Sequence, residues 1–108
     1  MDYDSMITAL KKNALQIKKE FPFVIQIFLF GSFSKGNFSP ESDVDILIIV
    51  KKISIPFLER RDQFYKFFKE IPFDVNILIY SETEIEKMKK NRNLFITDIM
   101  EDAVDLLD

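Results

Sequence analysis

The sequence has no cysteine and no histidine, and it has only two glycines and four prolines among its 108 residues. Without cysteine the chain can form neither disulfides nor a thiolate zinc site. Without histidine it lacks the usual general base and the usual transition-metal ligand. Any chemistry must therefore depend on carboxylates, hydroxyls, lysine, arginine and backbone amides.

The net charge is small and negative, −3 with an isoelectric point near 5.0. Direct binding of nucleic acid is not expected, because gripping its phosphates needs a positive surface. A single nucleotide held through a metal ion is still compatible with this charge. The first ten residues lack a signal-peptide pattern and no apolar run reaches membrane-spanning length, so we expect a cytoplasmic protein without a membrane partner.

Hydrophobic residues make up 47% of the chain and include twelve phenylalanines, enough to fill the core of one domain over residues 1–108. Hydrophobic spacing and turn residues predict alternating helices and strands. The predicted helices cover residues 5–19, 32–35, 56–69, 81–90 and 94–100, and the predicted strands cover 23–30, 43–50 and 73–80. The tail, residues 103–107, fits a helical turn or an edge strand equally well. This order, α-β-α-β-α-β-α-α, predicts an α/β fold with a small mixed sheet of three to four strands covered by helices.

The lengths of the connections predict how the strands pair. The short link between the first two strands fits an antiparallel pair, whereas the link to the third contains a helix and permits a parallel one. With these pairings, Gly31-Ser32 at the end of the first strand lies beside the starts of the other two.

Acidic residues open both of these later strands. Asp43 and Asp45 are two residues apart on a strand, so both side chains leave the same face, roughly 7 Å apart at the backbone. Asp74 stands at the start of the third strand in the same way. Carboxylates gathered at a partly dry site repel one another, and a divalent cation such as Mg²⁺, which takes oxygen ligands and substrate phosphates, removes that conflict.

The Gly31-Ser32 turn offers groups that suit a phosphate. Glycine lets the backbone approach an anion closely, and a helix starting after it would present free N–H groups. The hydroxyl of Ser32 and the ammonium of Lys35 lie within reach of the same anion, and Ser42, expected to shape the turn before the aspartates, is a further candidate. A lone Asp-x-Asp or Gly-Ser is more often only a strand entrance or a turn, but the combined string is more specific.

That string resembles the nucleotidyltransferase superfamily that includes DNA polymerase β. FGS at 30–32 is similar to its first motif, DVDI at 43–46 to its second, and Asp74 to its later acidic residue. The small size resembles the minimal nucleotidyltransferases (MNT family). Many relatives carry arginines in the glycine-serine loop, where this chain has Phe33 and Lys35.

The resemblance implies transfer of a nucleoside monophosphate, AMP from ATP, to a hydroxyl. Asp43 and Asp45 would hold Mg²⁺ on the triphosphate, and Asp74 would help bind a second Mg²⁺ and take the proton of the attacking hydroxyl. Gly31 and Ser32 would hold the phosphates.

The resemblance also implies a partner, a HEPN-domain ribonuclease toxin that an MNT antitoxin silences by adenylylating it. Two alternatives stay open: an idle antitoxin of the same fold that neutralises its partner by binding alone, and a nucleotidyltransferase acting on a small molecule.

Overall fold

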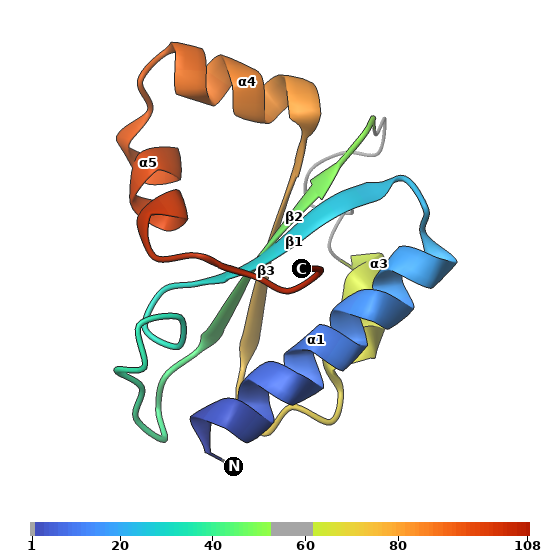
Figure 1. Cartoon of the computed structure of the whole chain (residues 1–108), viewed down its shortest axis with the longest axis vertical. Coiled ribbons are helices and arrows are strands. Elements are labelled where there is room, and N and C mark those ends of the chain that lie inside the picture. Colours follow the sequence, from blue (N-terminus) through green and yellow to red (C-terminus); the bar gives the residue numbers. More distant parts are fainter. Residues whose placement is uncertain (1, 53–61) are drawn as a thin grey trace.

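The computed structural model describes residues 2–52 and 62–108, so the beginning of the helix predicted over 56–69 lies outside the described residues. Figure 1 shows helices packed on a small central sheet. The elements are α1 (Tyr3–Glu20), β1 (Val24–Phe30), β2 (Val44–Val50), α3 (Asp62–Tyr65), the 3-10 helix η1 (Lys66–Phe68), β3 (Val75–Ser81), α4 (Glu82–Lys90), α5 (Leu94–Glu101) and β4 (Val104–Asp105).

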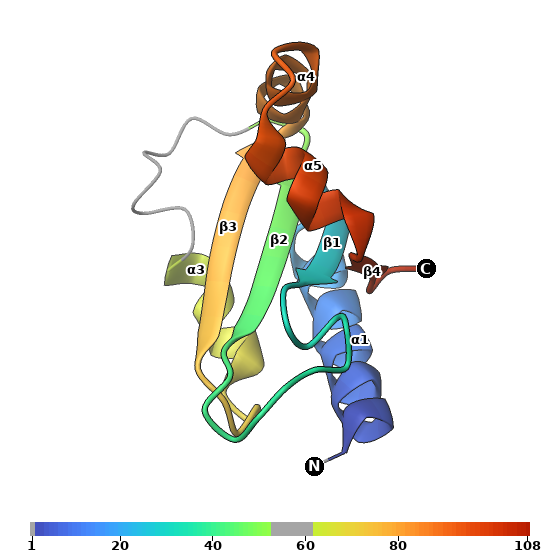
Figure 2. The ribbon, with the colours of Figure 1, turned by 90° about the vertical axis from the view of Figure 1, so that its left-hand side faces the viewer.

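The four strands form one mixed sheet in the order β3-β2-β1-β4. β1 pairs antiparallel with β2, and β2 pairs parallel with β3, as the connection lengths predicted. The tail forms the short strand β4, antiparallel to β1 at the sheet edge, which decides between the two structures that the sequence allowed. Figure 2 shows β2 between β3 and β1.

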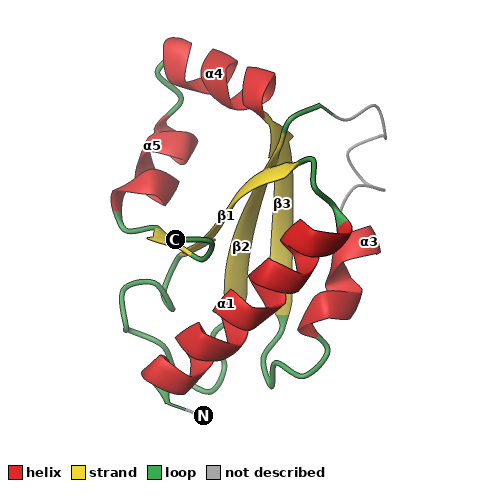
Figure 3. Cartoon of the chain, turned by 45° about the vertical axis from the view of Figure 1, so that its right-hand side comes forward, coloured by secondary structure: helices red, strands yellow, loops and turns green. Residues whose placement is uncertain are grey.

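Strand β2 is covered on both faces, as its alternation predicted. Its even-numbered residues, from Val44 to Val50, pack in the core with α1 and the segment 64–71. Leu47 and Ile49 on the other face pack in a second core with α4 and α5. Figure 3 shows α1 and α3 on one side of the sheet and α4 and α5 on the other.

Helix α1 presents one apolar stripe to the sheet, at the helical spacing that the sequence predicted. The buried residues of this stripe, each at most 1% exposed, are Met6, Leu10, Ala14 and Ile17. The side chain of Asp2 caps the helix by accepting a hydrogen bond of 2.8 Å from the backbone N–H of Ser5.

The helix predicted over residues 32–35 is wrong, because this segment is a tight turn. Gly31 and Gly36 bracket it, and both adopt positive φ, 78° and 76°. The left-handed backbone at both ends leaves too few residues between them to propagate a helix. The turn is closed instead by hydrogen bonds from the N–H of Gly36 to the carbonyl of Phe33 (3.2 Å) and from Asn37 to Ser32 (3.1 Å).

Across residues 2–52 and 62–108, no helix combines the length and apolar character needed to cross a membrane. The longest helix, α1, carries lysines on the face opposite its buried stripe.

A reciprocal capping box begins α4, as the spacing of Ser81 and Glu84 predicted. The hydroxyl of Ser81 accepts from the N–H of Glu84 at 3.1 Å, and the Glu84 carboxylate accepts from the N–H of Ser81 at 2.8 Å.

We expect Ser81→Ala to lower the free energy of unfolding by about 1 kcal/mol, measured by urea titration, because the N–H of Glu84 loses its hydrogen-bond acceptor and the reciprocal pair is broken. Ser81→Asp keeps an acceptor and should stay close to wild type. An alanine variant as stable as the aspartate variant would contradict this role.

Candidate functional site

Three chain segments meet at one end of the sheet: the end of β1, the start of β2 and the start of β3 (Figure 2). The register pairs Asp45 with Phe30 on one side and with Asn76 on the other. The N–H of Val44 donates to the carbonyl of Asp74 at 2.8 Å, which continues the parallel ladder one residue before β3 begins. The sheet therefore brings the predicted segments to a common edge.

Gly31 lies directly against the carboxylate of Asp45. A Cβ atom built on Gly31 would come within 2.4 Å of Asp45 Oδ2, and the backbone φ of 78° is unfavourable for any residue with a side chain. Glycine at this position is thus required twice, once by the turn and once by the approach of its backbone to the carboxylate.

The environment of Asp45 disfavours its ionised form. Burial raises the pKa of the Asp45 carboxyl, a hydrogen bond from the Asn76 amide lowers it, and the charge of Asp43 raises it, with a net effect above the ordinary value of 3.8. An opposite charge close to the pair would relieve both desolvation and repulsion. The site is accordingly prepared for a cation.

The amide of Asn76 bridges the two aspartates. Its Nδ2 lies 3.2 Å from Asp43 Oδ2 and 3.2 Å from Asp45 Oδ1. Asn76 is a site residue that the sequence motifs did not predict. Its spacing carries only part of the signal: Asn76 is two residues after Asp74 and so shares that residue's strand face, but its position beside Asp45 follows only from the pairing of β2 with β3.

Asp74 was expected to join Asp43 and Asp45 in one metal site. It reaches the same end of the sheet but is not grouped with them. Among the described residues, no three acidic side chains are placed to hold one metal ion. Asp74 precedes β3, and the register places Asn76, which is exposed like Asp74, opposite Asp45. Asp74 instead lines a cavity of about 370 Å³ together with Asp43 and Ser42.

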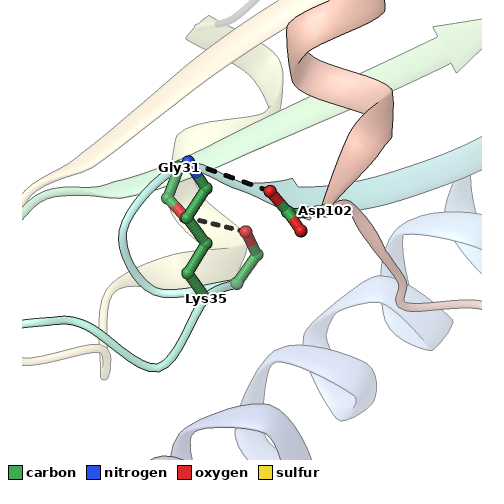
Figure 4. Close-up of polar contacts among 4 residues, drawn as sticks. Gly31, Lys35 and Asp102 are labelled. Atoms are coloured by element: carbon green, nitrogen blue, oxygen red, sulfur yellow. Dashed lines mark hydrogen bonds and ion pairs between the residues drawn. The ribbon is translucent and has the colours of Figure 1, made fainter.

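Lys35 makes an ion pair with Asp102, just after α5, at 3.8 Å from Nζ to Oδ2. Both side chains are about half exposed, at 53% and 50%, so this pair contributes little stability and can open. Figure 4 shows the ion pair beside Gly31, whose carbonyl also accepts a hydrogen bond of 2.7 Å from the Ser34 hydroxyl. Lys35, which was predicted to bind a phosphate, thus has an anionic partner, Asp102, that competes with the phosphate.

Ser42 shapes the turn before the aspartates, as expected. Its hydroxyl accepts from the N–H of Ser39 at 2.9 Å, and its N–H donates to the carbonyl of Ser39 at 3.0 Å. These bonds hold the chain at the point where it enters β2, so Ser42 positions Asp43 through the backbone.

Phe33 anchors the turn to the core. Phe33 stands in the glycine-serine loop, where many members of the resembled family carry arginines. Its side chain is fully buried. It stacks on Phe38 with ring centroids 4.4 Å apart and meets Phe73 edge-on at 4.8 Å. This contact ties the turn after β1 to the residues before Asp74, so the surroundings of the aspartates are held by packing.

The residues present fit one divalent cation. Asp43 and Asp45 direct one oxygen each toward a common atom, the Asn76 nitrogen, and burial raises the pKa of the Asp45 carboxyl. Magnesium is typically held by one or two carboxylates, with substrate phosphates completing the shell. The two-carboxylate set therefore suits one metal ion that arrives with a phosphorylated substrate.

A larger hollow of about 650 Å³ lies elsewhere, between α1 and the segment around η1. Its wall includes Lys12, Glu20 and Lys66, and the last two form an ion pair at 3.2 Å. It contains none of the residues singled out by the motifs, so size does not mark the candidate site here.

Comparison with known proteins supports the motif reading. Residues 10–106 match the family described as a nucleotidyltransferase domain. MJ0141 of Methanocaldococcus jannaschii, assigned as a protein adenylyltransferase, is 33% identical over 79 residues, which cover 73% of this chain and 76% of the relative.

Solved structures share the fold. A protein of Sulfolobus solfataricus assigned as a nucleotidyltransferase superposes with a TM-score of 0.68 at 21% identity, over 95% of this chain and 80% of the other. A toxin–antitoxin structure with AMP-PNP gives 0.64 at 18% identity, over 89% and 71%. A complex of tri-AMPylated Shewanella oneidensis HEPN toxin with MNT antitoxin gives 0.58 at 15% identity, over 93% and 71%.

The two glycines form a matched pair for testing the contact with Asp45. Both have positive φ, but a Cβ on Gly36 meets nothing within 4 Å. We expect Gly36→Ala to lower the free energy of unfolding by about 1–2 kcal/mol through backbone strain alone and to leave Mn²⁺ binding unchanged. Gly31→Ala should cost more and weaken Mn²⁺ binding, because the Asp45 side chain must turn away. Equal Mn²⁺ affinity in the two variants would contradict this contact.

The raised pKa of Asp45 predicts a pH-dependent gain in stability when its charge is removed. The native state binds the proton more readily than the unfolded chain, so stability falls as pH rises from the ordinary value of 3.8 through the native pKa. We expect Asp45→Asn to raise the free energy of unfolding near pH 7 in EDTA, with the gain vanishing near pH 3. Glu86→Gln, the same change at an exposed residue of α4, is the control. A loss of stability in Asp45→Asn near pH 7 would contradict the assignment.

Proposed function

The chain belongs to the nucleotidyltransferase domain family, and we propose that it transfers AMP from ATP to a hydroxyl of a partner protein in a Mg²⁺-dependent reaction. The observation that carries this proposal is the pair of carboxylates, Asp43 and Asp45, bridged by the amide of Asn76, with Asp45 against the backbone of Gly31. The protein adenylyltransferase assignment of the relative from Methanocaldococcus jannaschii supports the choice of AMP and of a protein acceptor.

Asp43 and Asp45 would hold the metal ion, which when bound supplies charge neutralisation to the triphosphate. Gly31 lets the backbone come close to the phosphates, and Ser32 adds a hydroxyl. Lys35 would exchange its exposed partner Asp102 for a phosphate oxygen. Among the described residues only two carboxylates, Asp43 and Asp45, converge and no third acid joins them, so the proposal uses one metal ion where the family resemblance implied two.

The transfer needs a base for the acceptor hydroxyl, and Asp74 is the candidate. It is exposed and lines the same cavity as Asp43, so an acceptor entering that cavity meets both carboxylates. The acceptor oxygen bonds to the α-phosphorus, the bond to pyrophosphate breaks, and the hydroxyl proton passes to Asp74. Positioning and electrostatics supply most of the rate in such transfers, so the absence of histidine is no obstacle.

We assign the acceptor to a HEPN ribonuclease toxin, with this chain as its antitoxin in the cytoplasm. The support is the fold shared with antitoxin complexes, one of which contains an AMPylated HEPN toxin. The net charge of −3 also suits a basic RNA-cleaving partner, because complementary potentials favour association.

One observation favours a second candidate, an antitoxin that neutralises its toxin by binding alone. An amide, Asn76, stands where the strand register would place a third carboxylate, and a weaker metal site would lower catalysis. The two candidates differ in one measurable property, the covalent modification of the toxin.

The test incubates the purified chain with a purified HEPN ribonuclease toxin, Mg²⁺ and α-phosphate-labelled ATP. We expect label on the toxin, and a loss of about 100-fold or more in Asp43→Asn and Asp45→Asn, because the charge that holds the metal ion is removed. Glu86→Gln, remote on α4, should transfer normally.

Intact mass and unfolding curves confirm that each variant is folded. Full transfer by either aspartate variant would contradict the assignment of the site. Toxin neutralisation without any labelled toxin would favour the binding-only antitoxin.

A further inference from the structure

Asn76 occupies a position that its sequence context does not reveal. In the parallel pair of β2 and β3 it stands opposite Asp45, on the strand face from which both aspartates project. Asp74 comes two residues earlier, outside β3, and binds β2 through its backbone carbonyl. The third side chain at the centre of the site therefore belongs to Asn76.

The orientation of the Asn76 amide follows from its neighbours. Ionised carboxylates only accept hydrogen bonds, so the nitrogen, with its two N–H groups, must face Asp43 and Asp45. The two N···O distances are equal, 3.2 Å, which gives each aspartate one hydrogen bond from the same nitrogen. A partial positive charge thus stands between two negative ones.

This amide cannot do what a carboxylate would do for a metal ion. An amide nitrogen offers no lone pair to magnesium, and only its carbonyl oxygen, which is neutral, can serve as a ligand. A cation that enters between the aspartates must displace the Nδ2 hydrogen bonds, after which the amide can rotate to present its oxygen. The ligand set then carries two negative charges and not three.

We infer that Asn76 is a positioning residue that holds Asp43 and Asp45 together before the metal ion binds and keeps the affinity of the free protein for divalent cations low. Metal ion then enters chiefly together with the phosphates of the nucleotide, which complete its shell. This inference rests on the proposed function for its nucleotide, but its metal-binding part can be tested alone.

The decisive variants place or remove one carboxylate without touching Asp43 or Asp45. Asn76→Asp adds a third acid at the bridging position, and Asp74→Asn removes the acid that precedes β3. The double variant, Asp74→Asn with Asn76→Asp, keeps the net charge of the wild type and only moves the acid. Asn13→Asp, on α1 away from these strand ends, is the matched control for added charge.

The probe is Mn²⁺, titrated into the nucleotide-free full chain and followed by electron paramagnetic resonance of the free ion. We expect Asn76→Asp and the double variant to bind Mn²⁺ at least about tenfold more tightly than wild type, because ligand charge sets divalent affinity. Asp74→Asn and Asn13→Asp should change the affinity less than about twofold. Thermal unfolding with and without Mn²⁺ shows that the variants fold and that the ion binds the folded state.

Two results would overturn the inference. One is an Asn76→Asp variant whose Mn²⁺ affinity rises no more than that of Asn13→Asp. The other is a drop of about tenfold in Asp74→Asn, which would make Asp74 a ligand of the free protein. Because Mn²⁺ binding needs neither ATP nor toxin, the expected affinities without any AMP transfer would refute the proposed function and leave the role of Asn76 intact.

Discussion

The main constraint on this structure is that two like charges, Asp43 and Asp45, stand at the start of β2, a strand that is otherwise buried. Burial and the charge of Asp43 both disfavour ionised Asp45, whose carboxylate occupies the space that a side chain at Gly31 would fill. The Asn76 amide offsets part of this cost through two hydrogen bonds. Two like charges placed side by side lower stability, so the arrangement points to function.

The rest of the molecule makes this arrangement rigid. Strand β2 is packed on both faces, and Phe33 fixes the turn after β1 to the aromatic rings of Phe38 and Phe73. The aspartates therefore project from the end of a well-packed sheet and not from a free loop. Preorganisation of this kind is what phosphoryl-type transfer needs, because its rate depends on position and charge.

Elements with a strong hydrophobic period could be predicted from the sequence, and local exceptions could not. The buried stripe of α1, the two faces of β2 and the cap of α4 follow from spacing alone, and the structure confirms them. The segment 32–35 was mistaken for a helix because hydrophobic and turn signals do not show that Gly31 and Gly36 at its two ends both adopt positive φ. Asn76 was missed because its role depends on register across two strands, a long-range property that spacing within one strand does not contain.

The most direct test of the central claim is a crystal structure of the chain soaked with Mn²⁺ and a non-hydrolysable ATP analogue, with the ion located by anomalous scattering. The account predicts one ion bound to oxygens of both Asp43 and Asp45 at about 2.1–2.2 Å, with the triphosphate against Gly31-Ser32 and the Asn76 nitrogen displaced. An ion bound elsewhere, or a nucleotide seated away from this turn while Asn76 still bridges both aspartates, would contradict it.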